Sequence, residues 1–153
     1  MSATLTHPGA DLRCRCCTIP VSEDLHAPAA ARRAADAFLD TIGPALPDAA
    51  RDDALLIVSE LVTNAVRHAG GPRTLRLTAS PGALEVAVSD GSPTTPVPRQ
   101  PDLVDGTGGL GWPLLTCLTT SLYATPEAYG KTTHATLAFT RREEADRAVA
   151  EGR

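Results

Sequence analysis

Residues 59–69 read Ser59-Glu60-Leu61-Val62-Thr63-Asn64-Ala65-Val66-Arg67-His68-Ala69. In this apolar-periodic segment Glu60, Asn64 and His68 recur every four residues, so a helix would place them along one stripe of its surface. Asn64 is also the only asparagine of the chain. A carboxylate one turn from an amide oxygen suits a Mg²⁺ ion that keeps most of its waters, with the amide as ligand and the carboxylate orienting or deprotonating a reactant. The alternative is a solvated helix face without chemistry.

Apolar spacing predicts that this stretch closes the longest helix of the chain, which runs from Asp48, a possible cap, to about Ala69. The glycines and proline of residues 70–72 would end that helix sharply. Its buried stripe would consist of Ala54, Val58, Leu61, Val62, Ala65 and Ala69. A second helix is predicted over residues 27–42, ended by Gly43-Pro44.

Alternating apolar residues predict strands on both sides of these helices. We expect strands at about residues 12–18, 74–78, 84–88, 120–125 and 132–139. Pro81-Gly82 would form the turn between the second and third of them. A short helix is expected from about Trp112 to Leu118.

The segment between residues 91 and 111 is rich in proline and glycine, and such a long loop in a compact domain is usually functional. It starts at Asp90, which is either a turn residue or an acceptor for an exocyclic amine such as that of adenine. It ends in Gly106-Thr107-Gly108-Gly109-Leu110-Gly111, directly before the short helix. Glycines there would let backbone N–H groups converge on an anion, although a flexible loop has the same composition. The segment is neither a Walker A loop nor a dinucleotide fingerprint.

Length and composition indicate one domain of 153 residues with 42% hydrophobic and only 3% aromatic residues. We expect a disordered N-terminus at residues 1–10, a single folded domain at residues 11–140 and a charged tail at residues 141–153. The net charge of −4 gives no reason to expect direct binding of nucleic acid. The sequence also shows no secretory leader and no apolar run long enough for a membrane, so we expect a cytoplasmic protein.

Three of the four cysteines form the cluster Cys14-x-Cys16-Cys17, and Cys117 stands alone. This spacing lacks the paired ligands of a zinc site. The cluster falls in an alternating segment, as in a half-buried strand, so we interpret the cysteines as small buried hydrophobic residues. A redox role stays open.

The order of these motifs resembles that of the GHKL superfamily, the ATP-binding fold shared by sensor histidine kinases, gyrase B and MutL. The chain looks most like the small stand-alone bacterial anti-sigma-factor serine kinases, because residues 59–69 read almost as their N-box. The resemblance covers about residues 12–140, and its other specific part is Gly108-Gly109-Leu110-Gly111. It implies a two-layer α/β sandwich of the Bergerat type. A mixed, mainly antiparallel sheet would carry helices on one face, with ATP between the helices and a lid.

The resemblance also implies roles for individual residues. Asn64 would ligate a Mg²⁺ ion that bridges the ATP phosphates, and Glu60 would polarise the attacking hydroxyl of a protein serine or of water. Asp90 would accept a hydrogen bond from the adenine amino group, and Gly91 would allow the base to approach closely.

The remaining roles fall on the lid and its surroundings. Residues 92–108 would form the lid, and Thr132 would help to hold adenine through water. His68 would either pack under the lid or contact the nucleotide. Four residues of the glycine motif would complete the cofactor site, the second and fourth of them meeting the phosphates: Gly108, Gly109, Leu110 and Gly111.

Two functions are consistent with this resemblance. The first is a Mg²⁺·ATP-dependent serine/threonine kinase that phosphorylates a STAS-type anti-anti-sigma protein and sequesters a sigma factor. The resemblance also implies that a homodimer can form, because the family often forms one. The second is a nucleotide-dependent binding module that captures a regulator without catalysis. Leu110, where the family often carries arginine, and Ser92, where larger members carry glycine, favour the second. The short segment before residue 12 leaves no room for a phosphoacceptor helix, so we do not expect autophosphorylation on histidine.

Overall fold

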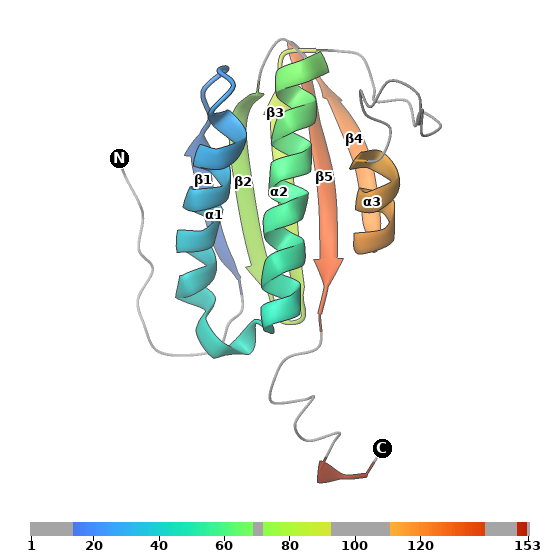
Figure 1. Ribbon diagram of the computed structural model, residues 1–153. Coiled ribbons are helices and arrows are strands. Elements are labelled where there is room, and N and C mark those ends of the chain that lie inside the picture. Colours follow the sequence, from blue (N-terminus) through green and yellow to red (C-terminus); the bar gives the residue numbers. More distant parts are fainter. Residues whose placement is uncertain (1–13, 69–71, 93–110, 140–149, 153) are drawn as a thin grey trace, which may run out of the picture.

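The computed structural model describes residues 14–68, 72–92, 111–139 and 150–152 (Figure 1). Helices and strands fall close to the segments that the apolar spacing predicts. In chain order they are β1 (Arg15–Pro20), α1 (Ala27–Ile42), the short 3-10 helix η1 (Gly43–Ala45), α2 (Asp48–His68), β2 (Pro72–Ser80), β3 (Ala83–Asp90), α3 (Gly111–Leu118), β4 (Ser121–Glu127) and β5 (Gly130–Ala138). None of the described helices combines the length and the apolar character needed to cross a membrane.

The five strands form one sheet in the order β1-β2-β3-β5-β4. Every neighbouring pair of described strands is antiparallel, so the sheet expected to be mixed and mainly antiparallel has no parallel pair among them. The helices lie on one face of the sheet, as Figure 1 shows. The predicted two-layer α/β sandwich is therefore confirmed.

The core lies between the sheet and α2. Alternate residues of β2 and β3 point to the helices, and they are fully buried, as are the apolar residues of α2 that face them. Burying one such Leu, Ile or Val side chain contributes about 1.5–3 kcal/mol. The main contributors are Leu75, Leu77, Leu84, Val86 and Val88 from the sheet, and Ile57, Val58, Leu61 and Val62 from α2. This packing fixes which face of α2 remains available for chemistry.

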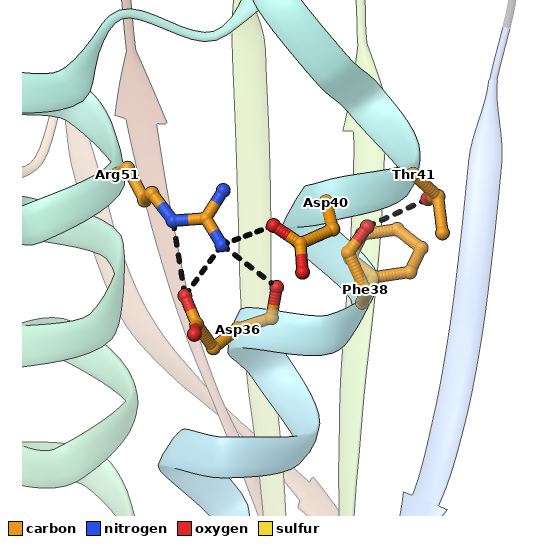
Figure 2. Close-up of polar contacts among 5 residues, drawn as sticks. All are labelled: Asp36, Phe38, Asp40, Thr41 and Arg51. Atoms are coloured by element: carbon orange, nitrogen blue, oxygen red, sulfur yellow. Dashed lines mark hydrogen bonds and ion pairs between the residues drawn. The ribbon is translucent and has the colours of Figure 1, made fainter.

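A charged cluster joins α1 to α2 (Figure 2). Arg51 of α2 donates from Nε and Nη2 to Asp36 Oδ1 at 2.9 and 2.6 Å, and from Nη2 to the Asp36 carbonyl oxygen at 3.1 Å. The same Nη2 donates to Asp40 Oδ1 at 2.6 Å. The hydrogen bonds that Arg51 donates to Asp40, and then to Asp36, raise the pKa of Arg51 above its ordinary value. The guanidinium therefore stays charged and ties the two helices together.

Two details of the elements differ from the sequence-based expectations. Asp48 is the first residue of α2 and lies within its first turn, because the Arg51 N–H donates to the carbonyl of Pro47 at 3.0 Å. The cysteines in and next to β1 are not buried: Cys14, which precedes the strand, and Cys16 are exposed, and Cys17 is half-buried. Cys117 of α3 is exposed as well.

The register of β1 explains the exposure of its cysteines. Cys16 pairs with Thr78 of β2, whose side chain lies on the face away from the helices, whereas Cys17 pairs with the buried Leu77. The side chains of this strand do alternate between the two faces of the sheet, but those on the face toward the helices belong to Arg15, Cys17 and Ile19. Arg15 can take an inward position because β1 is an edge strand and its guanidinium reaches out to the carbonyl of Thr41.

In the described part of the chain, no helix covers the opposite face of the sheet (Figure 1). It is lined by polar side chains around a shallow depression of about 460 Å³. Tyr123 of β4 and His134 of β5 stack there with ring centroids 4.7 Å apart. The sheet thus has one apolar and one polar face, as antiparallel sheets commonly do.

Candidate nucleotide site

The residues expected to bind nucleotide come from elements that meet at one end of the sheet. The C-terminal end of α2, the end of β3 and the start of β5 lie at the same end of the sheet in Figure 1. Strands β3 and β5 pair antiparallel, so the end of β3 lies beside the start of β5. Asp90 and Lys131, which are 41 positions apart in sequence, are thereby adjacent.

Glu60 and Asn64 lie one turn apart on α2, and both are half-buried. The neighbouring Ser59 hydroxyl instead makes a hydrogen bond within the helix, because it donates to the Leu55 carbonyl at 2.9 Å. Two members of the expected stripe, Glu60 and Asn64, thus have their carboxylate and amide on neighbouring turns of the helix.

Gly111, the first residue of α3, lies directly against Glu60. A Cβ built on Gly111 would overlap Oε2 of the Glu60 carboxylate. The absence of a side chain at Gly111 is therefore what lets the start of α3 approach this carboxylate. The last glycine of the glycine-rich motif is therefore a direct neighbour of the Glu60 carboxylate of α2.

Asp90 ends β3 and is 4% exposed, and its carboxylate accepts two hydrogen bonds. Lys131 Nζ donates to Asp90 Oδ1 at 3.0 Å, and the Ser92 backbone N–H donates to the same oxygen at 2.9 Å. Lys131 Nζ also lies 3.4 Å from the Ser92 carbonyl oxygen. The side chain of Lys131 is itself only 7% exposed, so this is a buried ion pair.

The local backbone explains why Asp90 and Lys131 meet. They are directly opposite in the β3–β5 register, so their side chains share one face of the sheet. Gly130 precedes Lys131, and a Cβ there would overlap the carbonyl oxygen of Asp90. On the other side, a bulge between Pro72 and Thr74 places Pro72 opposite Asp90 and leaves Arg73 as the extra residue. Such bulges often lie beside functional sites.

Gly91 follows Asp90 and is half-buried. A Cβ on Gly91 would lie 3.2 Å from Nη2 of Arg73. The bulged residue therefore brings a cation to the backbone that follows Asp90. Arg73 was not among the residues expected from the sequence.

Thr132 does not join Asp90. It pairs with Ser89 of β3 and Thr125 of β4, and it lines the depression on the polar face of the sheet. Its hydroxyl donates to the carboxylate of Glu127. Because neighbouring strand residues point to opposite faces, Lys131 and Thr133 share the face of Asp90 and Thr132 lies on the other. The role of Thr132 in holding adenine through water stays a prediction.

The other expected site residues fall outside the described part of the chain. These are Gly108, Gly109, Leu110 and the side chain of His68.

Sequence reasoning missed Lys131, although two signals point to it. It is the only lysine of the chain, and it directly follows a glycine at the start of a predicted strand. A lysine in a core-facing strand position is rare unless it is paired.

The donor set suits Mg²⁺ with a nucleotide better than Mg²⁺ held by protein alone. Glu60 and Asn64 provide a carboxylate and one amide oxygen from the same helix face. Mg²⁺ is usually bound by one or two protein oxygens, with water and phosphate oxygens as the remaining ligands. A Cβ on Gly111 would overlap the Glu60 carboxylate, so the missing side chain lets this carboxylate lie against the start of α3. The residues present therefore fit a metal that arrives with phosphates.

The chain is similar to a known protein family and to solved structures. A family model described as the histidine kinase-like ATPase domain matches residues 21–148. No curated protein matches the chain. Among solved structures, the RsbU and RsbW domains of Rv1364c from Mycobacterium tuberculosis share 18% identity with it, at a TM-score of 0.60. The alignment covers 83% of this chain and 32% of that one. The chain thus spans about a third of that protein, and this likeness concerns the fold alone.

Proposed function

The chain belongs to the histidine kinase-like ATPase domain family, and from this premise we propose that it binds Mg²⁺·ATP where α2, α3 and the β3–β5 strand ends meet. The proposal rests on one observation above all. Gly111 of the glycine-rich motif contacts Glu60 of α2, so two motifs separated by 50 residues of sequence converge on one carboxylate. Chance motifs would have no reason to converge.

Each residue has a chemical task in this proposal. Asp90 accepts a hydrogen bond from the exocyclic amine of adenine, and Gly91 lets the base approach the strand end. Asn64 supplies an amide oxygen to the metal. The bound metal would neutralise phosphate charge. Glu60 polarises the hydroxyl that attacks the γ-phosphate, because a carboxylate within reach of that hydroxyl can take up its proton.

We propose further that the acceptor is a serine or threonine of a small STAS-type partner, and that the nucleotide-bound protein sequesters a sigma factor. The fold of the RsbU and RsbW domains of Rv1364c and the N-box of residues 59–69 support a partner-switching role. Phosphoryl transfer requires mainly positioning and charge neutralisation, which Glu60, Asn64 and the metal could supply. A new phosphate would add nearly two negative charges at the partner's interface and release it.

A second candidate function is nucleotide-dependent capture of a regulator without catalysis. The observation that favours it is Leu110, which stands in a position where the family often carries arginine. In this case the nucleotide would set the conformation of the binding surface and would not be consumed.

Calorimetric titration with ATP, with and without Mg²⁺, tests the shared part of both functions. We expect binding that strengthens with Mg²⁺. No heat of binding at millimolar ATP would refute nucleotide binding. The remaining hypothesis would then be capture of a partner that does not depend on a nucleotide.

Glu60→Gln then separates the two functions. Asp52→Asn is the matched control, because Asp52 is an exposed carboxylate on the same helix. Labelled ATP is supplied together with a STAS-domain protein from the same genome. Catalysis predicts that Glu60→Gln binds ATP but transfers no label, whereas Asp52→Asn behaves as the wild type. Equal labelling by Glu60→Gln would exclude Glu60 as the base.

A further inference from the structure

The edge strand β1 carries an exposed thiol. Within the described residues β1 pairs with β2 alone, so its outer edge presents backbone N–H and C=O groups that no described strand uses. Such an edge is a template on which another strand can pair. Cys16 belongs to this strand and is exposed, whereas Cys17 is half-buried on the face toward the helices. A nucleophilic side chain therefore lies where a second chain can dock.

The surroundings of Cys16 suit a reactive thiol. It lies opposite Thr78 of β2, whose hydroxyl donates to Cys16 Sγ at 3.6 Å. Arg76 is the diagonal neighbour of Cys16 on the same face, and its half-exposed guanidinium lies 3.8 Å from Glu85 in a loose ion pair. Thiolates attack oxidants, and reactive cysteines are typically exposed and close to cations. Cys16 has both properties.

None of the other cysteines is placed to bridge Cys16 within one folded chain. Cys17 is its neighbour on the strand and points to the other face. Cys14 is two residues away, and side chains at that spacing on extended chain have Cβ atoms about 6–7 Å apart, whereas a disulfide needs about 3.5–4.5 Å. Cys117 lies on α3, which packs against β4 at the opposite edge of the sheet. The partner thiol must therefore come from another molecule.

We propose that Cys16 is an oxidation site at which hydrogen peroxide links two copies of this chain through a Cys16–Cys16 disulfide. The β1 strands of the two copies would pair antiparallel across a two-fold axis. Directly opposite residues of antiparallel strands have Cα atoms about 4.5–5.5 Å apart, which lies within the range of about 4.4–6.8 Å that disulfides require. The inference does not rest on the proposed nucleotide binding.

Charge selects the register of this pairing. With Cys16 on the two-fold axis, Arg15 of each copy lies opposite Cys17 of the other. A shift that pairs Cys14 with Cys16 would instead place the two Arg15 residues directly opposite each other, and like charges in that position are destabilising. A further alternative puts Cys17 on the axis, but its thiol is less accessible than that of Cys16.

The chemistry balances with peroxide as the oxidant. The Cys16 thiolate of one copy attacks an oxygen of hydrogen peroxide, so an S–O bond forms, the O–O bond breaks and hydroxide leaves. The product is a sulfenic acid. The Cys16 thiolate of the second copy then attacks that sulfur, forming the S–S bond and releasing a second hydroxide. Both hydroxides take up a proton, so two thiols lose two electrons and peroxide becomes two waters.

The test follows disulfide-linked dimer on non-reducing gels after the reduced protein is mixed with hydrogen peroxide. Peptide mapping by mass spectrometry identifies the bridged cysteines. Four serine variants each remove one thiol: Cys14→Ser, Cys16→Ser, Cys17→Ser and Cys117→Ser. Cys117→Ser is the matched control, because Cys117 is exposed like Cys16 but lies on a helix. The same series in urea removes the strand edge and leaves only the reactivity of the thiols.

We expect the wild type to form a dimer that dithiothreitol reverses, with Cys16 bridged to Cys16. Cys16→Ser should form dimer at least about tenfold more slowly, and the other three variants should stay within about twofold of the wild type. In urea the four thiols should react alike, so Cys16→Ser should lose its special effect.

Three results would overturn the proposal. One is a Cys16→Ser variant that dimerises as fast as the wild type, and another is a bridge that maps to Cys17 or Cys117. The third is a protein that stays monomeric, either with a disulfide within the chain or with oxygen added to its thiols and no disulfide. Each of these results leaves the proposed nucleotide binding untouched, because calorimetric titration of the reduced protein tests that separately.

Discussion

Gly111 at the start of α3 leaves room for the Glu60 carboxylate of α2, since a Cβ at that position would overlap Oε2. Gly111→Ala should therefore displace either Glu60 or the start of α3. We expect Mg²⁺·ATP affinity to fall about tenfold, because the displaced groups would lie at the phosphate end of the site. Calorimetric titration measures this loss.

The thermal midpoint of Gly111→Ala should change little, because alanine favours the helix over glycine by up to about 1 kcal/mol and offsets part of the overlap. Thr116→Ala, at an exposed position of the same helix, is the control. An alanine variant that binds Mg²⁺·ATP as tightly as the wild type would show that α3 yields without disturbing the site.

Asn64→Ala tests the assignment of the amide to the metal. We expect the affinity for Mg²⁺·ATP to fall by about tenfold or more, whereas the affinity for ATP without metal changes by less than about threefold. The difference arises because the amide oxygen would contact the ion and not the base. Thr63→Ala, half-buried beside it on α2, is the control. Equal losses with and without Mg²⁺ would instead assign Asn64 to the nucleotide or to packing.

The large elements could be predicted from the sequence because their cores follow simple periods. The helix over residues 27–42 has the bounds of α1, and the stripe from Ala54 to Ala65 is buried as expected. Each helix has one neighbouring layer to face, so the apolar spacing determines its orientation without knowledge of the partner.

Strand faces were harder to predict because a shift of one residue reverses them. Thr132 and Lys131 are neighbours, and only the pairing of Lys131 with Asp90 reveals which of them faces the helices. Cys16 and Cys17 present the same problem in β1, where the partner strand decides which cysteine is exposed. Neither answer is contained in the local sequence, since both depend on contacts between distant segments.

The cluster around Arg51 should stabilise the packing of α1 on α2 unequally through its two partners. Asp36 takes three of the hydrogen bonds from Arg51, whereas Asp40 takes one. Because these side chains are partly exposed, we expect Arg51→Met to lower the free energy of unfolding by about 1 kcal/mol. Asp36→Asn should cost more than Asp40→Asn.

Urea denaturation of the wild type and of the Arg51→Met, Asp36→Asn and Asp40→Asn variants measures these differences in the free energy of unfolding. Arg32→Met, an exposed arginine of α1, is the control and should change the stability by less than about 0.5 kcal/mol. A larger loss for Asp40→Asn than for Asp36→Asn would contradict the bonding pattern of Figure 2.

The Lys131–Asp90 pair makes a prediction about stability that is independent of any nucleotide. Lys131→Met leaves the Asp90 carboxylate buried without its cation, which should lower the free energy of unfolding by about 3–5 kcal/mol. Adding Asp90→Asn removes the isolated charge, so the double variant should recover most of that loss even though it has one more substitution. Urea denaturation of the wild type, both single variants and the double variant gives the coupling energy. If the losses of the single variants simply add, the two side chains do not compensate each other. The antiparallel pairing of β3 with β5 would then hold their ends together without help from this ion pair.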